Sequence, residues 1–98
     1  MLMRVFQVTV HDGKEAEFRD FFENTALPLM QRQDGLVSIT AGAPRPETPQ
    51  EFCMVMVWRD LDALKAFAGE AWQDAHVHAD EAELVKARRI SHYEVVGR

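Results

Sequence analysis

A run of eight residues, 51–58, is apolar at nearly every position and limits the possible folds more than any other feature of the chain. Successive side chains of a β-strand point to opposite faces of its sheet. As a strand, this run would place Phe52, Met54, Met56 and Trp58 on one face and Cys53, Val55 and Val57 on the other. A strand buried on one face only should alternate apolar with polar residues. The run therefore predicts a sheet that is covered on both faces.

Three further segments have the composition of strands, and two segments between them have the spacing of helices. The predicted strands are rich in β-branched and aromatic residues and comprise Leu2–Val10, Leu36–Ala43, Glu51–Trp58 and Arg89–Val96. One face of the first helix would present, at helical spacing, Phe18, Phe21, Phe22, Thr25 and Leu29. The second helix would begin at Asp60, end near Gly69 and bury Leu61, Leu64 and Phe67. The order β-α-β-β-α-β predicts an α+β, ferredoxin-like domain with a four-stranded antiparallel sheet.

Two segments have the spacing of a capping box, in which an acidic residue is followed three residues later by glutamate. Asp12 with Glu15 would start the first helix in this way. Asp80 with Glu83 would start a further short helix that ends near Ala87. Both patterns predict a side-chain oxygen that accepts a hydrogen bond from a backbone N–H of the first helical turn.

Prolines and glycines mark the remaining boundaries. Pro28 should kink or fray the first helix, because proline has no backbone N–H to donate. Gly35 suits the left-handed conformation that ends such a helix. The three prolines within residues 44–49 predict a loop, and residues 70–76 resemble one or two further helical turns.

Chain length and crossover handedness together predict a homodimer. The 98 residues suffice for one domain, 1–98, and crossovers of one hand place both helices on the same face of the sheet. The other apolar face would then be an exposed patch larger than a soluble monomer tolerates. Face-to-face pairing of two sheets would cover it, while a large internal ligand cavity is the competing explanation.

The charge balance argues against polyanionic partners. The chain has 16 acidic and 11 basic residues, a net charge of −5, whereas nucleic acids and anionic membranes require a basic surface. We therefore expect neither partner. The start of the chain lacks the pattern of a signal peptide, and no apolar run approaches the ~20 residues of a membrane-spanning helix. These observations predict a cytoplasmic location.

Several apolar residues could form the wall of a small-molecule pocket. Trp58 ends the third strand and Trp72 follows the second helix, and both could stack against an aromatic ligand. Met54, Met56 and Phe67 would complete an adaptable apolar lining. We expect a small apolar or aromatic ligand at these five residues. The same side chains would serve equally well as an ordinary core.

Histidine is the residue type most able to move a proton near neutral pH, and His92 in the last strand is the predicted general base. His76 and His78 would point to opposite sides of a helix, so we expect no metal site from them. The single cysteine, Cys53, lies in an apolar run and is expected to be a small buried hydrophobe. The sequence lacks the usual nucleotide, flavin and haem-attachment motifs, and we expect no cofactor.

The chain resembles the antibiotic biosynthesis monooxygenase (ABM) superfamily of dimeric α+β barrels over nearly its whole length. The similarity rests on the order and spacing of five segments, Asp12–Glu15, Gln33–Ser38, Val57–Leu64, Ala66–Trp72 and His92–Val95. The resemblance implies one of several activities, because this superfamily spans cofactor-independent oxygenases, haem-degrading enzymes and other members.

The oxygenase branch would oxidise polycyclic phenols or anthrones to quinones without a cofactor. Its strand-end tryptophan matches Trp58, but the polar residue that some members have four positions earlier is Met54 here. The haem branch implies His76 as axial ligand, whereas its asparagine and tryptophan positions are held by Phe6 and Phe67. We therefore predict a cofactor-independent monooxygenase acting on a small aromatic or polyketide-like molecule. The alternatives are a non-catalytic small-molecule-binding or structural barrel and, after it, a haem-degrading monooxygenase.

Overall fold

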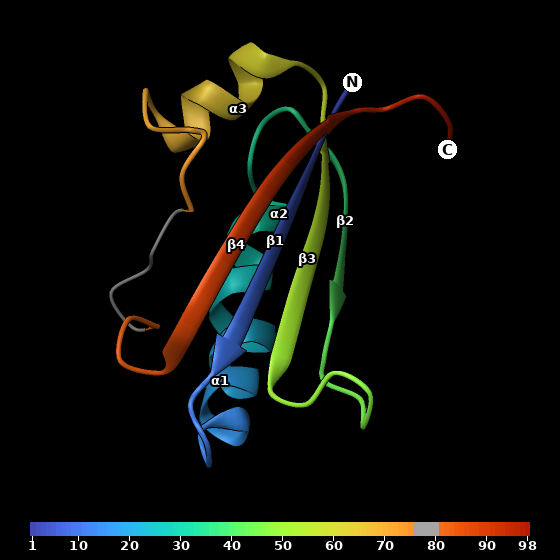
Figure 1. Ribbon diagram of the computed structural model, residues 1–98. Helices are drawn as coiled ribbons and strands as arrows, with labels where there is room; N and C mark the ends of the chain where they lie inside the picture. The colour runs from blue at the N-terminus through green and yellow to red at the C-terminus, as the bar shows by residue number, and fades with distance from the viewer. Residues whose placement is uncertain (76–80) are drawn as a thin grey trace.

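The four strands form one antiparallel sheet in the order β2-β3-β1-β4, in a computed structural model that describes residues 1–75 and 81–98 (Figure 1). The strands are β1 (Leu2–Val10), β2 (Leu36–Gly42), β3 (Glu51–Trp58) and β4 (Val85–Glu94). β1 and β3 lie in the centre, where each pairs with neighbours on both sides. The ferredoxin-like prediction is confirmed, and the first and third strands have the predicted boundaries.

One long helical segment and one shorter helix complete the domain. The long segment comprises α1 (Glu15–Phe21), a π-helical turn η1 (Phe22–Ala26) and α2 (Leu27–Gln31), and it crosses behind the sheet in Figure 1. The shorter helix is α3 (Leu61–Ala68), which packs near the end of β3. In the described ranges, no helix is long and apolar enough to cross a membrane.

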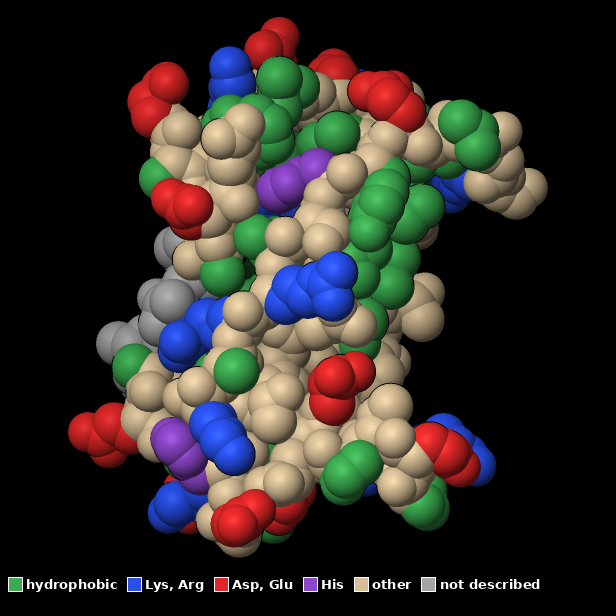
Figure 2. Space-filling model, viewed as in Figure 1, with side chains coloured by type: hydrophobic (Ala, Val, Ile, Leu, Met, Phe, Trp, Pro, Cys, Tyr) green, Lys and Arg blue, Asp and Glu red, His purple; other side chains and the backbone are tan. Residues whose placement is uncertain are grey.

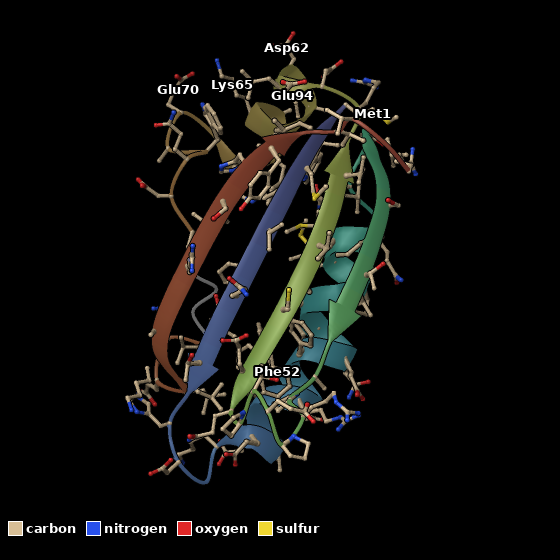
Figure 3. All side chains as sticks on the ribbon, turned by 45° about the vertical axis from the view of Figure 1, so that its right-hand side comes forward. Met1, Phe52, Asp62, Lys65, Glu70 and Glu94 are labelled. Atoms are coloured by element: carbon tan, nitrogen blue, oxygen red, sulfur yellow. The ribbon has the colours of Figure 1, made fainter. Side chains whose placement is uncertain are left out.

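The helix-facing side of the sheet contains the core. Even-numbered residues of β1 and β3 point to this side, and Val8, Phe52 and Trp58 are almost fully buried. The ring of Phe52 lies 4.7 Å from that of Phe18 in α1, centroid to centroid. Figure 3 shows Phe52 at the start of β3, where the helical segment crosses behind the sheet. Close aromatic pairs of this kind add to the stability that burial alone provides.

No helix of the described residues lies on the opposite face of the sheet. Its central side chains belong to the odd-numbered residues of β1 and β3, among them Met3, Val5, Cys53, Val55 and Val57. The outer strands add more polar side chains, such as Thr40 and Arg89. Figure 2 looks onto this face and shows apolar side chains gathered along the side formed by β2 and β3. We name this surface the open face.

The first helix is distorted near Pro28, as the sequence predicted, but by a π-helical turn that precedes the proline. The π-helical turn ends at Ala26, and Pro28 lies in the first turn of α2. Because proline cannot donate to the carbonyl four residues back, the preceding turn widens and the helix continues beyond it. The predicted kink is therefore a local change of helix type.

The two predicted capping boxes and the Asp60 cap have different outcomes. The carboxylate of Asp60 accepts a hydrogen bond from the backbone N–H of Ala63 at 2.9 Å, as expected. The Asp12 prediction is wrong, because α1 starts after Lys14 without a side-chain cap. Asp12 instead accepts a hydrogen bond from the side chain of Gln50, which ties the first turn to the loop before β3.

The predicted helix over residues 80–87 is also wrong, since β4 begins at Val85 rather than at Arg89. Residue 80 lies outside the described residues, and residues 81–84 form a turn. Val85 pairs with Val10 across a bulge and is buried. β1 therefore also pairs with the residues of β4 that precede Arg89. The basic side chains among these residues obscured the apolar pattern of a strand in the sequence. Residues 70–73, within the helical stretch predicted over 70–76, are a turn.

Gly35 has the predicted left-handed backbone, with φ +82°. A Cβ atom built there would lie 2.5 Å from the Cβ of Ala63 in α3. Both the backbone angle and the close approach of the helix therefore require glycine at this position.

Candidate functional site

A cavity of about 70 Å³ lies between the long helical segment and the helix-facing side of the sheet. Its helical wall includes three aromatic residues, Phe18, Phe21 and Phe22. The sheet contributes mainly apolar side chains as well, among them Phe6, Met54, Met56 and Ile90. Ligand sites are typically such apolar hollows with a few well-placed polar groups. The homodimer and the ligand cavity were competing explanations for a strand that is apolar on both faces. They concern different faces of the sheet, because the cavity lies on the side opposite the open face.

Three of the five residues predicted to bind substrate line this cavity, namely Met54, Met56 and Phe67. Trp58 and Trp72 are not among the described lining residues. Trp58 is completely buried and stacks on Phe67, with ring centroids 5.5 Å apart and an interplanar angle of 26°. Trp58 therefore supports the cavity wall from behind, and direct contact of either tryptophan with a ligand stays a prediction.

Arg4 is a buried cation in the cavity wall that the sequence analysis did not single out. It points to the helix side of β1, and only 2% of its surface is exposed. Its Nη1 donates hydrogen bonds to the backbone oxygen of Trp72 and to Nε2 of His92. Its Nη2 donates to the backbone oxygen of Asp74 at 3.2 Å. Arg4 thereby fastens the segment after α3 to the sheet.

A sequence signal for Arg4 did exist. The residue occupies a helix-facing position of the first strand, between Leu2 and Phe6. A charge on the buried face of a strand is rare unless it is paired or functional. Burial lowers the pKa of the Arg4 guanidinium, but an arginine keeps its proton throughout the physiological range.

Glu81 is the second charged residue of the cavity wall that the sequence analysis did not identify as a site residue. Its side chain lines the cavity, and 4% of the residue is exposed. The sequence placed it in the first turn of a surface helix, so its burial was not predicted. The structure instead forms a turn over residues 81–84, directly before the buried Val85, and Glu81 is buried in it.

His92 lies on β4 directly opposite Arg4 in the register. Its Nε2 is 3.0 Å from Nη1 of Arg4. Because arginine can only donate, Nε2 must be the unprotonated acceptor, which fixes the neutral Nδ1–H tautomer. Burial, and then the charge of Arg4, lower the pKa of His92 below its ordinary value of 6.5. The ring of Trp72 covers the imidazole edge-on at 5.1 Å.

This arrangement predicts a specific loss of stability in acid. Between pH 6.5 and the lower pKa of the folded state, the unfolded chain binds a proton at His92 that the folded chain does not. The free energy of unfolding should therefore fall as the pH drops through that window and level off below it. Urea titrations across this range should show the fall in the wild type and in His11→Ala, the exposed control, but not in His92→Ala. If the difference in the free energy of unfolding between wild type and His92→Ala stays the same across this pH range, the Arg4–His92 contact is contradicted.

The other candidate ligands do not form a metal site in the described ranges. There, no group of three or more His, Cys, Asp or Glu side chains could hold an ion. His76, which the haem branch alone would use as a ligand, and His78 lie outside the described residues. Cys53 is half-buried on the open face, where burial, and then the nearby Glu51, raise the pKa of its thiol. A raised pKa disfavours the reactive thiolate.

The fold and the site together define a small ferredoxin-like protein with an apolar cavity between helices and sheet. The family model named antibiotic biosynthesis monooxygenase (ABM) matches residues 1–81, and the chain belongs to this family. The resemblance recognised in the sequence is thereby confirmed. A search of curated proteins gives no significant match.

Solved structures share the fold over nearly the full chain. A protein from Shewanella oneidensis is 17% identical, with a TM-score of 0.77, 94% of this chain covered and 87% of the other. A mutant of SnoaB, a cofactor-independent oxygenase from Streptomyces nogalater, is 26% identical, with a TM-score of 0.71 and 99% and 94% covered. A mutant of MhuD with two manganese protoporphyrin IX molecules per active site is 17% identical, with a TM-score of 0.74 and 100% and 97% covered.

Proposed function

We propose that the protein is a cofactor-independent monooxygenase acting on a small aromatic or polyketide-like molecule. The observation that carries this proposal is the apolar cavity in which Arg4 and Glu81 are the charged wall residues in the described ranges. Apolar aromatic walls would bind a planar ring, and a buried cation would stabilise a substrate anion. The family and the similarity to SnoaB support the same class of reaction.

In the proposed reaction the substrate supplies the electrons. A bound anthrone-type molecule loses a proton from its methylene carbon and becomes an enolate, which passes one electron to dioxygen. The radical pair combines to form a C–O bond, giving a hydroperoxide. Loss of water breaks the O–O bond and leaves a carbonyl group, so one oxygen atom enters the product and the other leaves as water. The protein therefore has to bind the substrate, hold its proton and exclude solvent.

The size of the cavity implies that its wall moves when a ligand binds. A polycyclic molecule needs several hundred Å³, whereas the cavity measures about 70 Å³. The π-helical turn η1 contributes Phe22 and Ala26 to this wall. Such turns have weaker hydrogen-bond geometry than an α-helix and frequently occur at functional sites. We propose that the long helical segment shifts at this turn to admit the substrate.

The described residues do not fit a haem. Phe6 and Phe67 occupy the cavity wall where the haem branch has an asparagine and a tryptophan. No described histidine lines it. The porphyrin in MhuD belongs to that protein, and we derive no step through haem for this chain.

The non-catalytic alternative rests on a different observation. Side chains such as Phe18, Met54 and Met56 fill most of the space between helix and sheet. This filling is also what a binding or structural protein would show. A ligand that binds without oxygen consumption would favour this alternative.

We further propose that the protein works as a homodimer in which two open faces pair. Val5 and Val55 are only partly buried there and present an apolar surface on which no described helix lies. Pairing would leave the two cavities on the outer, helix-covered sides. A cytoplasmic location stays a prediction.

Oxygen uptake with anthrones and polycyclic phenols tests the proposed activity directly. We expect saturable uptake without added flavin, nicotinamide or metal. The variant Ala26→Phe should lose this uptake, because the added ring fills the cavity that Ala26 lines. Ala66→Phe, on the exposed side of α3, is the matched control and should keep it. Equal uptake by both variants would show that the reaction takes place elsewhere or not at all.

A further inference from the structure

We propose that Arg4 and Glu81 act as an acid–base pair in the cavity and that their ligand is an aromatic phenol or enol. In this proposal Glu81 accepts the acidic proton and Arg4 binds the oxyanion that remains. The inference rests on the proposed function, since it names the substrate class and the proton acceptor of that site. It also assigns these roles to two residues that the sequence did not reveal.

Arg4 is held rigidly and still has hydrogens to offer. Two backbone oxygens, those of Trp72 and Asp74, and one ring nitrogen, that of His92, accept three of its five N–H donors. In the described part of the chain, Nε–H and one Nη2 hydrogen have no acceptor. A fixed guanidinium with spare donors in an apolar wall is suited to bind an oxyanion without reorganising.

Glu81 provides the complementary group. It is the one carboxylate that lines the cavity in the described ranges, and it is almost wholly buried. Arg4 and Glu81 line the same cavity between the long helical segment and the sheet. One oxygen-bearing ligand can therefore meet both charges.

The proton transfer needs no further reactant. The O–H bond of a phenol, or the acidic C–H bond of its keto form, breaks, and the proton forms an O–H bond on the Glu81 carboxylate. The negative charge moves to the ligand oxygen, which accepts hydrogen bonds from Arg4. A cation in direct contact lowers the pKa of such a ligand, because it favours the charged form. The site thus generates the electron-rich enolate that dioxygen can oxidise.

His92 has a different part in this arrangement. Its Nε2 lone pair accepts a hydrogen bond from Arg4, so it is not free to take a proton from a ligand. We assign His92 as a positioning residue that orients the guanidinium. The general base predicted from the sequence is replaced, in this proposal, by Glu81.

An anaerobic titration with 4-nitrophenol separates the two roles without any turnover, because its phenolate and phenol absorb at different wavelengths. We expect the wild type to bind the phenolate in preference to the neutral isostere 4-nitroanisole. Arg4→Lys should weaken phenolate binding by about 10- to 100-fold, the effect of losing a charge-assisted hydrogen bond. Glu81→Gln should bind the phenolate at least as well as the wild type, because a like charge has been removed. Arg32→Lys and Glu83→Gln, both exposed, are the matched controls.

Steady-state oxygen uptake then tests the base. Glu81→Gln should lower kcat by roughly 10²- to 10⁴-fold, the usual contribution of a general base, with KM little changed. Weaker phenolate binding in Glu81→Gln, or full kcat in it, would overturn the proposal. Circular dichroism spectra and melting curves identify any variant that fails to fold. If Arg4→Lys fails to fold, the isosteric variant Glu81→Gln still provides the test.

The inference and the proposed function can fail separately. If the wild type shows no oxygen uptake, but Arg4→Lys weakens phenolate binding and Glu81→Gln does not, the acid–base pair stands and the oxygenase proposal fails. If uptake occurs and Glu81→Gln leaves it intact, the oxygenase proposal stands and the pair is wrong.

Discussion

Replacement of Trp58 by alanine should lower the free energy of unfolding by about 3–5 kcal/mol. Trp58 is completely buried, stacks on Phe67 and lies between Leu2 and Leu36 in the sheet register. Removal of the indole would leave a large void that the paired strands cannot close. This loss is a large part of the about 5–15 kcal/mol by which small domains are stable. In a domain of this size it should lower the melting temperature by on the order of 20 °C. Urea unfolding at one fixed protein concentration measures the loss.

Trp58→Phe is the matched control for this prediction. The indole Nε1–H of Trp58 is buried and has no hydrogen-bond partner in the described ranges. Phenylalanine keeps most of the apolar volume and removes this unsatisfied donor, so we expect a change of only about 1 kcal/mol. If Trp58→Phe is as damaging as Trp58→Ala, the shape of the indole, and not only its apolar volume, is essential to the packing at this position.

Val55→Asp should convert the proposed homodimer to monomers, with at least roughly a thousandfold loss of association. Val55 lies at the centre of the open face, beside Val5 of β1 and Thr40 of β2. In a face-to-face dimer, two copies of the new carboxylate would be removed from water without a partner, at a cost of several kcal/mol each. Each 1.4 kcal/mol corresponds to a tenfold change in the dissociation constant. Analytical ultracentrifugation over a concentration series measures the shift.

Two further measurements complete this test. Ala66→Asp adds the same charge at an exposed position of α3 and should leave the dimer intact. The wild type should sediment as a dimer at micromolar concentration. A wild-type monomer, or a Val55→Asp protein that still dimerises, would rule out pairing through the open face. Because the cavity lies on the other face, ligand binding by a folded Val55→Asp monomer would show that each cavity is complete within one chain.

The sequence determined the strands well where local pattern and tertiary environment agree. β1 and β3 are central strands rich in apolar residues, and their predicted bounds are the observed ones. β4 was placed four residues late, because Lys86, Arg88 and Arg89 resemble a solvated helix. Only pairing with β1 shows that Val85 belongs to the sheet. Long-range pairing overrides local pattern at an edge strand, where one neighbour supplies all the hydrogen bonds.

The starts of the helices likewise separate what the local sequence pattern predicts from what tertiary contacts decide. Asp60 caps α3 through a contact three residues away, which is visible in the sequence. Asp12 has the same local pattern, but Gln50 competes for its carboxylate from a distant loop. A cap is a local interaction, and it is predictable only when no remote donor takes the oxygen first.

The sequence by itself determined the order of the elements, the two-faced apolar strand and the apolar part of the cavity wall, including Met54, Met56 and Phe67. These follow from period-2 and period-3.6 patterns, which depend only on near neighbours in the chain. Only the tertiary structure decided which groups are the polar ones in that wall. Arg4 and Glu81 come from opposite ends of the sequence and line the same cavity, and the pairing of β1 with β4 brings His92 beside Arg4. The physical reason is that a buried charge is recognised by its surroundings, and those surroundings exist only in the folded chain.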